Sequence, residues 1–399
     1  MRILHTSDWH LGRSFHRVGL LDAQAAFLEH LADVVRSESV DAVVVAGDVY
    51  DRALPAVDAV TVLDDGLDAI VDAGATVLVT SGNHDSSARL GFGARRSARG
   101  GVHLRTRVHD ASTPVLLADR HGPVALYGIP YAEPALVSDA LGVERGHAPV
   151  LRSLMDGVRA DLATHPTGTR SLVAAHAFVA GGDASDSERD ISVGGVGAVP
   201  ASVFDGVDYV ALGHLHGRQR LGEHVRYSGS PLPYSFSEQT HRKGSWLLEL
   251  GPGGLERVDA VDAPVLRPLA ILRGALQDLL TDPAHARHES SFCQVTLTDA
   301  QRPREPMERL RRRFPHVLAL GFDPEGRRDQ PVGYAERVRG LDDVDLCCAF
   351  VDHVRGAPAT DSERHLLRDA LEGGRLRDAE PVPGPRTAER AAKAQRGAA

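Results

Sequence analysis

Short β-branched segments alternate with helical repeats of apolar residues from residue 1 to about residue 264. Five segments are typical of buried strands: residues 3–6, 42–46, 76–80, 172–175 and 209–212. Apolar residues three and four positions apart predict amphipathic helices over residues 21–35 and 60–70. Because strands that alternate with helices form α/β domains, we expect an α/β fold with functional residues at the carboxyl ends of its strands.

A polar cluster follows each of these five segments. The clusters are Asp8-Trp9-His10, Gly47-Asp48-Val49-Tyr50-Asp51, Gly82-Asn83-His84-Asp85, His176 and Gly213-His214-Leu215-His216. Asp, Asn and His side chains are ligands of divalent metals, and glycine permits sharp turns. One Asp or Asn after a strand is more often a turn residue or a helix cap, and one His is more often structural. Five such clusters in this order instead predict a metal site.

The order DxH, GDxxD, GNHD, H and GHxH resembles the calcineurin-like metallophosphoesterase superfamily. Longer strings are similar to those of the SbcD family, the nuclease subunits of bacterial SbcCD complexes: GNHDSSARL, HAFVAGG, SERDISVGG, YVALGHLHG and YSGSPLPYSFSE. The resemblance covers residue 1 to about residue 244. It implies a two-sheet sandwich flanked by helices. It also implies an exonuclease and endonuclease that cuts DNA ends and hairpins in DNA repair, recombination and replication.

The resemblance further implies two metal ions. One would be held by Asp8, His10, Asp48 and His216, and the other by Asp48, Asn83, His176 and His214. Asp48 would bridge the two ions, and the mixed nitrogen and oxygen ligands suit Mn²⁺, with Mg²⁺ as a substitute. Two ions about 3.5–4 Å apart bind the attacking and leaving oxygens of an in-line displacement, so no nucleophilic side chain is required.

Two further residues receive catalytic roles from the same resemblance. His84 follows Asn83 and would stabilise or protonate the leaving group, a role that suits a side chain with a pKa near neutrality. Asp51 lies three residues after Asp48, and in related phosphoesterases an acid at this position orients that histidine.

The formal net charge of −9 excludes a uniformly basic nucleic-acid binder, so any contact with DNA must come from local patches and metal ions. Arginines follow the first and third clusters and are candidates for contacts with a phosphate backbone: Arg13, Arg17, Arg89, Arg95, Arg96 and Arg99. In a chain this rich in arginine, a solvated surface helix explains the same pattern equally well.

We divide the chain into four parts. Residues 1–264 are expected to form the metallophosphoesterase nuclease domain. Residues 265–340 are expected to form a small α+β domain with a helix, a strand at 292–297 and a second helix, which resembles the capping domain of SbcD-type nucleases. Residues 341–374 are expected to form two partner-binding helices, separated by Gly356 and Pro358. Residues 375–399 contain almost no large apolar side chains and are expected to be a disordered tail.

The two lysines show whether this chain could hydrolyse ATP through a Walker A loop. Lys243 and Lys393 are the only lysines, and neither stands between a glycine and a Ser or Thr, as a Walker A loop requires. This chain therefore has no such ATPase site. The resemblance implies that an SbcC-like coiled-coil ATPase supplies the ATP hydrolysis, and that the assembly is a homodimer of this chain within a heterotetramer. In SbcD-like proteins the terminal region docks on the partner's coiled coil, which favours docking through the apolar stripes of the terminal helices: Phe350, Val354, Leu367 and Leu371. The alternative is that these helices pack on their own domain.

Three cysteines without CxxC spacing, no leader-like segment and no apolar run long enough to cross a bilayer predict a cytoplasmic protein without a membrane span. The alternative function is a phosphomonoesterase or cyclic-nucleotide phosphodiesterase, because the same metal centre serves these reactions. A non-catalytic scaffold is a third reading. The extended strings favour the nuclease, and the complete set of ligand positions counts against the scaffold.

Overall fold

The structure is a computed structural model that describes residues 1–188, 198–324 and 341–378. The chain divides into two compact units. The first consists of Met1–Leu272, Asp282–Val295 and Met307–Leu320, and the second of Arg273–Thr281, Thr296–Pro306 and Gly321–Ala399.

Two six-stranded sheets form the body of the first unit. The first sheet has the order β14-β13-β1-β4-β5-β6. Its strands are β1 (Arg2–Thr6), β4 (Ala42–Ala46), β5 (Thr76–Thr80), β6 (Val102–Arg105), β13 (Gly244–Gly251) and β14 (Gly254–Asp262). Strands β1, β4, β5 and β6 run parallel to one another. β13 is antiparallel to both of its neighbours, β1 and β14.

The second sheet has the order β11-β12-β10-β9-β8-β7. Its strands are β7 (Val115–Asp119), β8 (Gly122–Ile129), β9 (Arg170–His176), β10 (Tyr209–Gly213), β11 (Gln219–Arg220) and β12 (Val225–Tyr227). The four central strands β8, β9, β10 and β12 are parallel, so the carboxyl ends of β9 and β10 lie at one edge.

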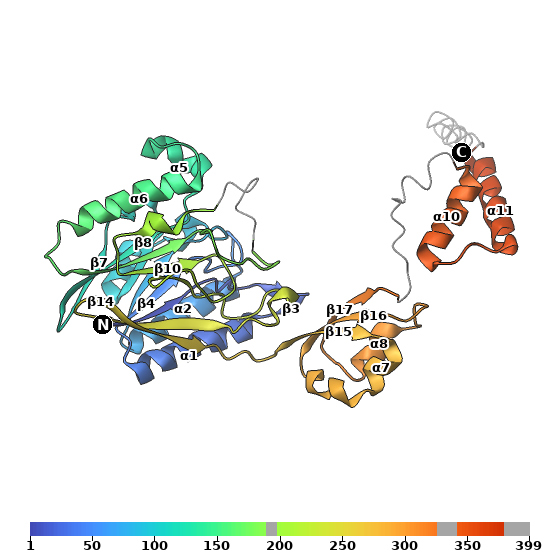
Figure 1. Ribbon diagram of the computed structural model, residues 1–399, viewed down its shortest axis with the longest axis horizontal. Coiled ribbons are helices and arrows are strands. Elements are labelled where there is room, and N and C mark those ends of the chain that lie inside the picture. The colour runs from blue at the N-terminus through green and yellow to red at the C-terminus, as the bar shows by residue number, and fades with distance from the viewer. Residues whose placement is uncertain (189–197, 325–340, 379–399) are drawn as a thin grey trace, which may run out of the picture. The chain divides into compact units, whose positions relative to one another are not determined.

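Helices cover the outer face of each sheet, which gives four layers (Figure 1). Helices α1 (Leu21–Glu38) and α2 (Val57–Asp72) pack on the first sheet, and α5 (Pro134–Leu141) and α6 (His147–Leu162) pack on the second. In β4, Val43 and Val45 pack against α1 and α2, while Val44 lies in the core between the sheets. Burial on both faces explains the uninterrupted apolar runs of the predicted strands. The predicted two-sheet α/β sandwich is confirmed.

Short elements connect these layers. They are β2 (Ser14–Phe15), β3 (Val18–Gly19), α3 (Ser87–Leu90), α4 (Ala94–Ser97), η1 (Ala98–Gly100), η2 (Val108–Asp110), η4 (Ala201–Phe204) and η5 (Phe236–Glu238). β2 and β3 pair with each other as a two-stranded sheet.

A separate three-stranded sheet has the order β15-β16-β17. The elements of this region are β15 (Leu269–Gly274), α7 (Leu276–Thr281), η6 (Pro283–His288), β16 (Phe292–Leu297), α8 (Pro306–Arg311) and β17 (Val317–Phe322). The sequence predicted the two helices and β16 but neither β15 nor β17. In β15 only Ala270 and Leu272 are buried, so too few inward-facing residues mark it as a strand.

The terminal helices are α10 (Asp343–Arg355) and α11 (Asp361–Asp378). α10 begins where the Asp342 side chain accepts a hydrogen bond from Asp345 N, and it ends at Gly356 in the left-handed conformation. α11 continues to Asp378 and so includes the first residues of the segment 375–399 that was expected to be a tail. The rest of that tail, and residues 325–340 of the predicted capping domain, lie outside the described residues. None of the helices in the described ranges has the length and apolar content of a membrane span.

Candidate metal centre

The seven predicted metal ligands come together at the carboxyl ends of strands from both sheets. The first sheet positions Asp8 and His10 after β1, Asp48 after β4 and Asn83 after β5, and the second sheet positions His176 at the end of β9 and His214 and His216 at the end of β10. All of them are buried except Asn83, which is partly buried.

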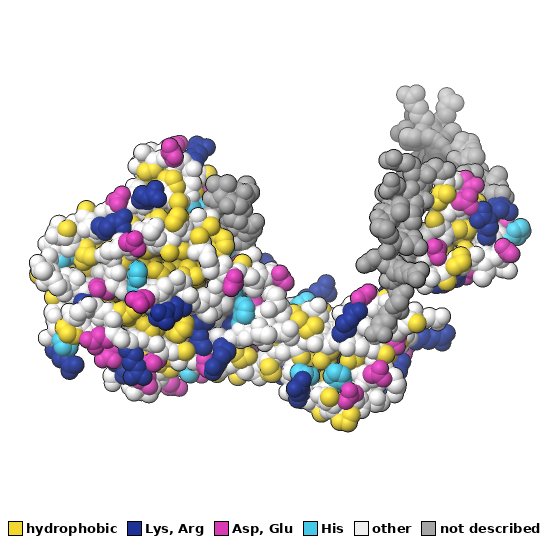
Figure 2. Space-filling model, in the orientation of Figure 1, with side chains coloured by type: hydrophobic (Ala, Val, Ile, Leu, Met, Phe, Trp, Pro, Cys, Tyr) yellow, Lys and Arg dark blue, Asp and Glu magenta, His cyan; other side chains and the backbone are white. Residues whose placement is uncertain are grey.

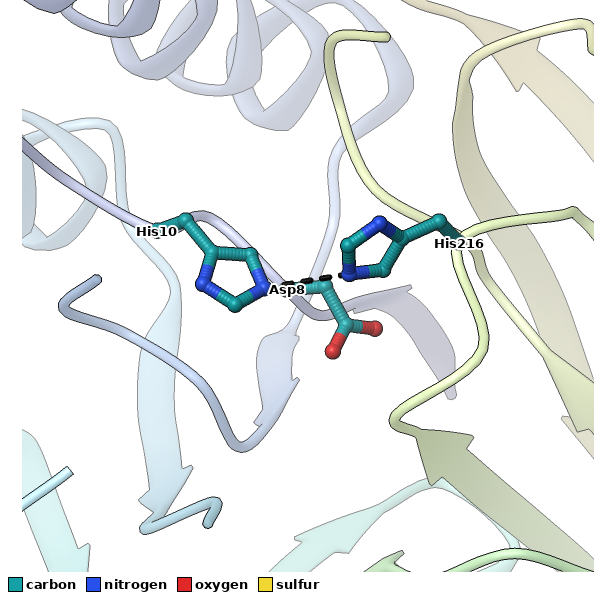
Figure 3. A group of neighbouring side chains, drawn as sticks. All are labelled: Asp8, His10 and His216. Carbon is teal, nitrogen blue, oxygen red and sulfur yellow. Dashed lines mark hydrogen bonds between the residues drawn. The ribbon is translucent and has the colours of Figure 1, made fainter. Parts of the chain in front are cut away.

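Asp8, His10 and His216 offer ligand atoms that all lie within 4.8 Å of one another (Figure 3). The His10 and His216 rings approach each other from different segments of the chain, and their Nε2 atoms are 3.1 Å apart. Asp48 Oδ2 lies 3.6 Å from His10 Nε2. These contacts group the four residues that were expected to hold one ion.

The other expected ligands converge on the Asn83 amide oxygen. Asn83 Oδ1 lies 2.9 Å from His176 Nε2 and 3.2 Å from His214 Nδ1. Asp48 Oδ2 lies 3.5 Å from His176 Nε2, so this one carboxylate reaches both groups of side chains.

Four of these residues have a left-handed backbone although none is glycine. The φ angles are 54° at Asp8, 45° at His10, 50° at Asp48 and 111° at His214. Such conformations cost about 1–3 kcal/mol each and are concentrated at functional sites. Main-chain hydrogen bonds between the loop after β1 and the loop after β4 hold the first three of these residues. They run from Asp8 N to Gly47 O and from His10 N to Asp48 O, each at 3.0 Å.

Glycine precedes several ligands because the loops approach one another closely. A Cβ atom on Gly82 would lie 2.1 Å from Asp48 Oδ1, and one on Gly213 would lie 1.9 Å from the Ala46 carbonyl oxygen. Any side chain at either position would push apart the loops that carry Asp48, Asn83 and His214.

The charges of the cluster fit a divalent cation. Burial raises the pKa of Asp8 well above its ordinary value, and the neighbouring Asp48 carboxylate raises it further. Burial lowers the pKa of His176 to about 3 and holds the pKa values of His10 and His214 well below their ordinary range. Two buried carboxylates together are unfavourable without a counter-ion, and neutral imidazoles are the form that binds a metal.

Hydrogen bonds fix which nitrogen of the key histidines faces the cluster. His176 Nδ1 lies 2.9 Å from the Ala46 carbonyl oxygen, which can only accept, so Nδ1 carries the proton and Nε2 offers a lone pair. His216 Nδ1 is 2.5 Å from Ser187 Oγ, which likewise leaves Nε2 facing His10. Two imidazole nitrogens 3.1 Å apart repel unless they share a proton or a cation.

A buried network that the sequence analysis did not identify lies behind His216. The Ser187 hydroxyl contacts His216 Nδ1 and donates to Glu238 Oε1 at 2.5 Å, and Lys243 Nζ donates to Glu238 Oε2. The main-chain N–H of His216 donates to Glu188 Oε1 at 2.7 Å. Ser187, Glu188 and Glu238 lie in the strings SERDISVGG and YSGSPLPYSFSE, so the resemblance marked their segments but not their role.

Asp85 is a further residue whose role was not predicted. Its carboxylate accepts hydrogen bonds from the main-chain N–H groups of Val49 at 3.0 Å, Tyr50 at 2.9 Å and Gly82 at 2.9 Å. It therefore ties the loop after β4 to the loop after β5. Burial raises the pKa of Asp85 to about 7, with a contribution from Asp48.

His84 is oriented by Asp51, but through a different atom from the one expected. His84 Nδ1 lies 2.8 Å from the main-chain carbonyl oxygen of Asp51. The Asp51 carboxylate instead lies 3.7 Å from His10 Nδ1 and 3.7 Å from Arg13 Nη1. The expected contact between that carboxylate and His84 is thus replaced by a main-chain contact, which leaves His84 Nε2 facing the cluster.

The predicted DNA-binding arginines do not share one environment. Arg13 lies at the cluster, where its guanidinium is 4.8 Å from the centre of the Tyr234 ring and donates to Ser187 O. Arg17, Arg89 and the arginines of α4 are exposed. On the face seen in Figure 2, the described Lys and Arg side chains are scattered among acidic ones and form no continuous stripe.

Residues 1–218 match the calcineurin-like phosphoesterase family. Residues 265–355 match the SbcD C-terminal domain family, which is described as the type 5 capsule protein repressor C-terminal domain.

Three solved structures are similar at low identity. TT1561 of Thermus thermophilus is 13% identical, with 65% of this chain and 98% of that chain covered and a TM-score of 0.38. GAP50, the anchor in the inner membrane complex of Plasmodium, is 12% identical, with 66% and 84% covered and a TM-score of 0.40. A dimetal phosphatase from Danio rerio is 15% identical, with 66% and 99% covered and a TM-score of 0.38. TM-scores this low add nothing to the family match.

The first family match spans more than half of the chain and contains all seven clustered ligand positions. The buried side-chain groups suited to a cation lie within it. The chain therefore belongs to the calcineurin-like phosphoesterase family and is a metal-dependent phosphoesterase.

Proposed function

We propose that this chain is the DNA nuclease subunit of an SbcCD-like complex and cuts DNA ends and hairpins by exonuclease and endonuclease activity. The observation that carries the proposal is the match of residues 265–355 to the SbcD C-terminal domain family. A phosphoesterase domain alone also serves phosphomonoesters and cyclic nucleotides. A second domain of the SbcD type following it in the same chain favours the nuclease.

The metal ligands of the proposed centre are the seven clustered side chains. Asp8, His10, Asp48 and His216 would hold one ion, and Asp48, Asn83, His176 and His214 the other. Asp48 suits the bridging role because its Oδ2 atom lies 3.6 Å from His10 Nε2 and 3.5 Å from His176 Nε2. The mixed imidazole and oxygen ligands suit Mn²⁺, with Mg²⁺ as a substitute. Bound ions would activate water and neutralise charge on the phosphate.

His84 is proposed as the group that protonates the leaving oxygen. Its Nδ1 atom is held by the Asp51 carbonyl, so only Nε2 is free to exchange a proton with a substrate. His84 Nε2 lies 4.0 Å from Asp48 Oδ2, next to the proposed bridging position. Asp51 is a positioning residue in this scheme, because it acts on the substrate only through His84.

A comparison of substrates tests the nuclease proposal. The purified chain with Mn²⁺ should cut labelled single-stranded and hairpin DNA, and His214→Ala should abolish this by removing an expected ligand. p-Nitrophenyl phosphate and cyclic nucleotides serve as the competing substrates. Hydrolysis of these small esters without any cleavage of DNA would establish the alternative function and refute the nuclease.

DNA contacts are proposed for Arg13, Arg17, Arg89, Arg95 and Arg96. Within the described residues the last four form no ion pair with a carboxylate, and all four are exposed, so their guanidinium groups are available to phosphates. Arg13 differs because Asp51, Tyr234 and Ser187 already engage it. It would order the edge of the metal centre as well as contact a phosphate.

An exposed apolar surface on α10 supports the proposal that the chain binds a partner protein. Phe350 is 57% exposed and Val354 is 66% exposed, which is unfavourable for an isolated helix in water. Leu367 and Leu371 on α11 are partly buried, and α11 is joined to α10 by the Arg364–Asp345 ion pair. We propose that Phe350, Val354, Leu367 and Leu371 support docking on the coiled coil of an SbcC-like ATPase. The assembly would be a homodimer of this chain within a heterotetramer.

A pull-down with the purified ATPase tests the docking surface. Phe350→Asp combined with Val354→Asp should abolish binding, because charges placed in an apolar interface are costly to desolvate. The control is Val57→Asp on α2, where the valine is 79% exposed. Binding of the double variant at the level of the control would place the contact elsewhere.

A further inference from the structure

A cavity of about 690 Å³ lies next to the segment that follows the GNHD motif. Its size is within the range of about 300–1,000 Å³ that is usual for ligand pockets. The side chains that matter for its chemistry are Phe92, Arg95, Arg96, Arg105, Arg107 and Asp110. None of these residues belongs to the metal centre.

The cavity is strongly positive because four arginines line it against one acid. Among the described residues, none of the four arginines forms an ion pair within 4.0 Å. Arg105 is half-buried, and its Nε atom donates to the main-chain carbonyl of Thr113 at 3.1 Å, which leaves the two terminal nitrogens for a ligand. Burial lowers the pKa of Arg105, and Asp110 opposes this effect. A partly desolvated cation of this kind is stabilised by an incoming anion.

An exposed aromatic ring stands at the same cavity. Phe92 is 83% exposed, although the segment around it is well fixed. Leu90 is buried, the Phe92 N–H donates to Arg89 O at 3.1 Å, and a Cβ atom on Gly91 would lie 2.2 Å from Thr106 Oγ1. An aromatic face beside arginines is the combination that binds single-stranded nucleic acid, because bases stack on the ring and phosphates pair with the cations.

Strand pairing places the cavity at the same sheet edge as the metal centre. Arg105, the last residue of β6, pairs in parallel register with Thr80, the last residue of β5. The loop that leaves β5 carries Asn83 and His84. A strand anchored at Arg105 therefore lies at the edge where the metal ligands are gathered.

We propose that this cavity binds one nucleotide of a single DNA strand, with its phosphate on Arg105 and Arg107 and its base stacked on Phe92. This rests on the proposed nuclease function and adds to it a strand-holding site outside the metal centre. Arg95 and Arg96 on α4 would contact the neighbouring phosphate. The recognition is independent of base sequence, since every base has a face that can stack.

Fluorescence anisotropy with labelled oligothymidylate tests the site, using the full chain in EDTA so that the probe is not cut. Phe92→Ala should weaken binding by about fivefold to a hundredfold. Arg105→Gln with Arg107→Gln should reduce the slope of log K against log salt by about 0.7, since both arginines bind the same phosphate and each neutralised phosphate on a single strand contributes about 0.7. The controls are Leu136→Ala for the exposed apolar side chain, and Arg120→Gln with Arg152→Gln for the charge.

The outcomes separate this inference from the nuclease proposal. All variants should hydrolyse bis(p-nitrophenyl) phosphate like the unaltered chain, because the metal centre is intact. If the unaltered chain cuts DNA and the cavity variants bind oligothymidylate as the controls do, the strand-holding site is refuted and the nuclease stands. If inorganic phosphate competes as well as the oligonucleotide at equal concentration, the cavity is a simple anion site and the inference is also overturned. If the unaltered chain hydrolyses the small diester but neither binds nor cuts DNA, the nuclease proposal itself fails.

Discussion

Glu238→Gln tests whether the network behind His216 holds that ring for metal binding. Glu238 and Lys243 are both buried, and Lys243 Nζ donates to Glu238 Oε2, to Ser230 Oγ at 2.9 Å and to His216 O at 2.8 Å. Glutamine keeps the volume and one acceptor oxygen of the side chain. It removes the negative charge, so the buried Lys243 ammonium would lose the carboxylate with which it pairs.

The expected loss of stability follows from that stranded charge. Removing one partner of a buried ion pair costs about 3–5 kcal/mol of the free energy of unfolding. Burial on its own would raise the pKa of Glu238, but the hydrogen bonding with His216 and the charge of Lys243 hold it well below its ordinary value. A pKa that is lower in the folded state contributes stability above the unfolded value of about 4.3, and this is lost as the pH falls through the folded pKa. The difference in the free energy of unfolding between the unaltered chain and the Glu238→Gln variant should therefore be largest at neutral pH and smaller in acid.

The expected effect on metal binding follows from the chain of contacts. Ser187 donates to Glu238 and in turn accepts from His216 Nδ1, so loss of the carboxylate loosens the ring that presents Nε2 to the cluster. Substitution of such supporting partners costs about 10–100-fold in metal affinity. Because Asn83 and His176 are not part of this network, one Mn²⁺ site should weaken and the other should stay close to its original affinity.

Two measurements on the unaltered chain and on the Glu238→Gln variant test whether the network holds His216 for metal binding. Denaturant unfolding gives the stability, and calorimetric titration with Mn²⁺ gives the two affinities. The matched control is Glu308→Gln, whose carboxylate pairs with Arg312 on the surface at 3.4 Å and should cost only about 0–1 kcal/mol. Reduced stability with unchanged Mn²⁺ binding would mean that the network supports only the fold, and the reasoning on His216 would be wrong.

Three further outcomes are expected. His84→Gln should keep both metals and lose cleavage by about 10²–10⁴-fold, because only the proton donor is removed; loss of metal in step with activity, measured by metal analysis, would make His84 a ligand. Asp48→Ala should abolish stoichiometric Mn²⁺ binding, since its carboxylate reaches both groups of ligands, and two tightly bound ions in the variant would contradict the bridging role. Asp119→Ala should cost about 3–5 kcal/mol at neutral pH in denaturant unfolding, because it strands the buried Arg170 that pairs with it at 2.6 Å. Hydrogen bonding from Arg170 lowers the pKa of Asp119, so its contribution to stability is fully present above the unfolded pKa of about 4 and is lost as the pH falls from there through the lowered pKa of the folded state. A cost no greater than that of the surface control Asp259→Ala would refute the pairing argument.

The sheets of the first unit could be predicted where strands are buried on both faces. Such strands give apolar runs that end at a polar cluster, and the predicted segments fall within β1, β4, β5, β9 and β10. β15 could not be predicted in this way, because one of its faces is exposed and Arg273 alternates with buried residues. Alternation over so few residues is indistinguishable from a loop in a single sequence.

The candidate ligands could be predicted as residue types, but not the atoms through which they act. His84 follows Asn83 in the chain, so its place beside the cluster depends only on the end of β5. Its orientation depends on the Asp51 carbonyl, a group that every residue possesses. The residue type at position 51 therefore does not predict this contact. Because position 51 holds an acid, the side chain of Asp51, and not its main chain, was expected to orient His84.

Lys243 is conspicuous in the sequence, but only its contacts with distant segments explain its role. In a chain whose cations are almost all arginine, its sequence context excludes only a Walker A role. The structure gives it three acceptors, from Glu238, Ser230 and the main chain of His216. An ammonium group has three donors and a guanidinium has five in a fixed plane, so arginine in this pocket would leave buried N–H groups without partners. The pocket thus requires a lysine, and its separation from His216 by twenty-seven positions is why no local pattern could reveal the reason.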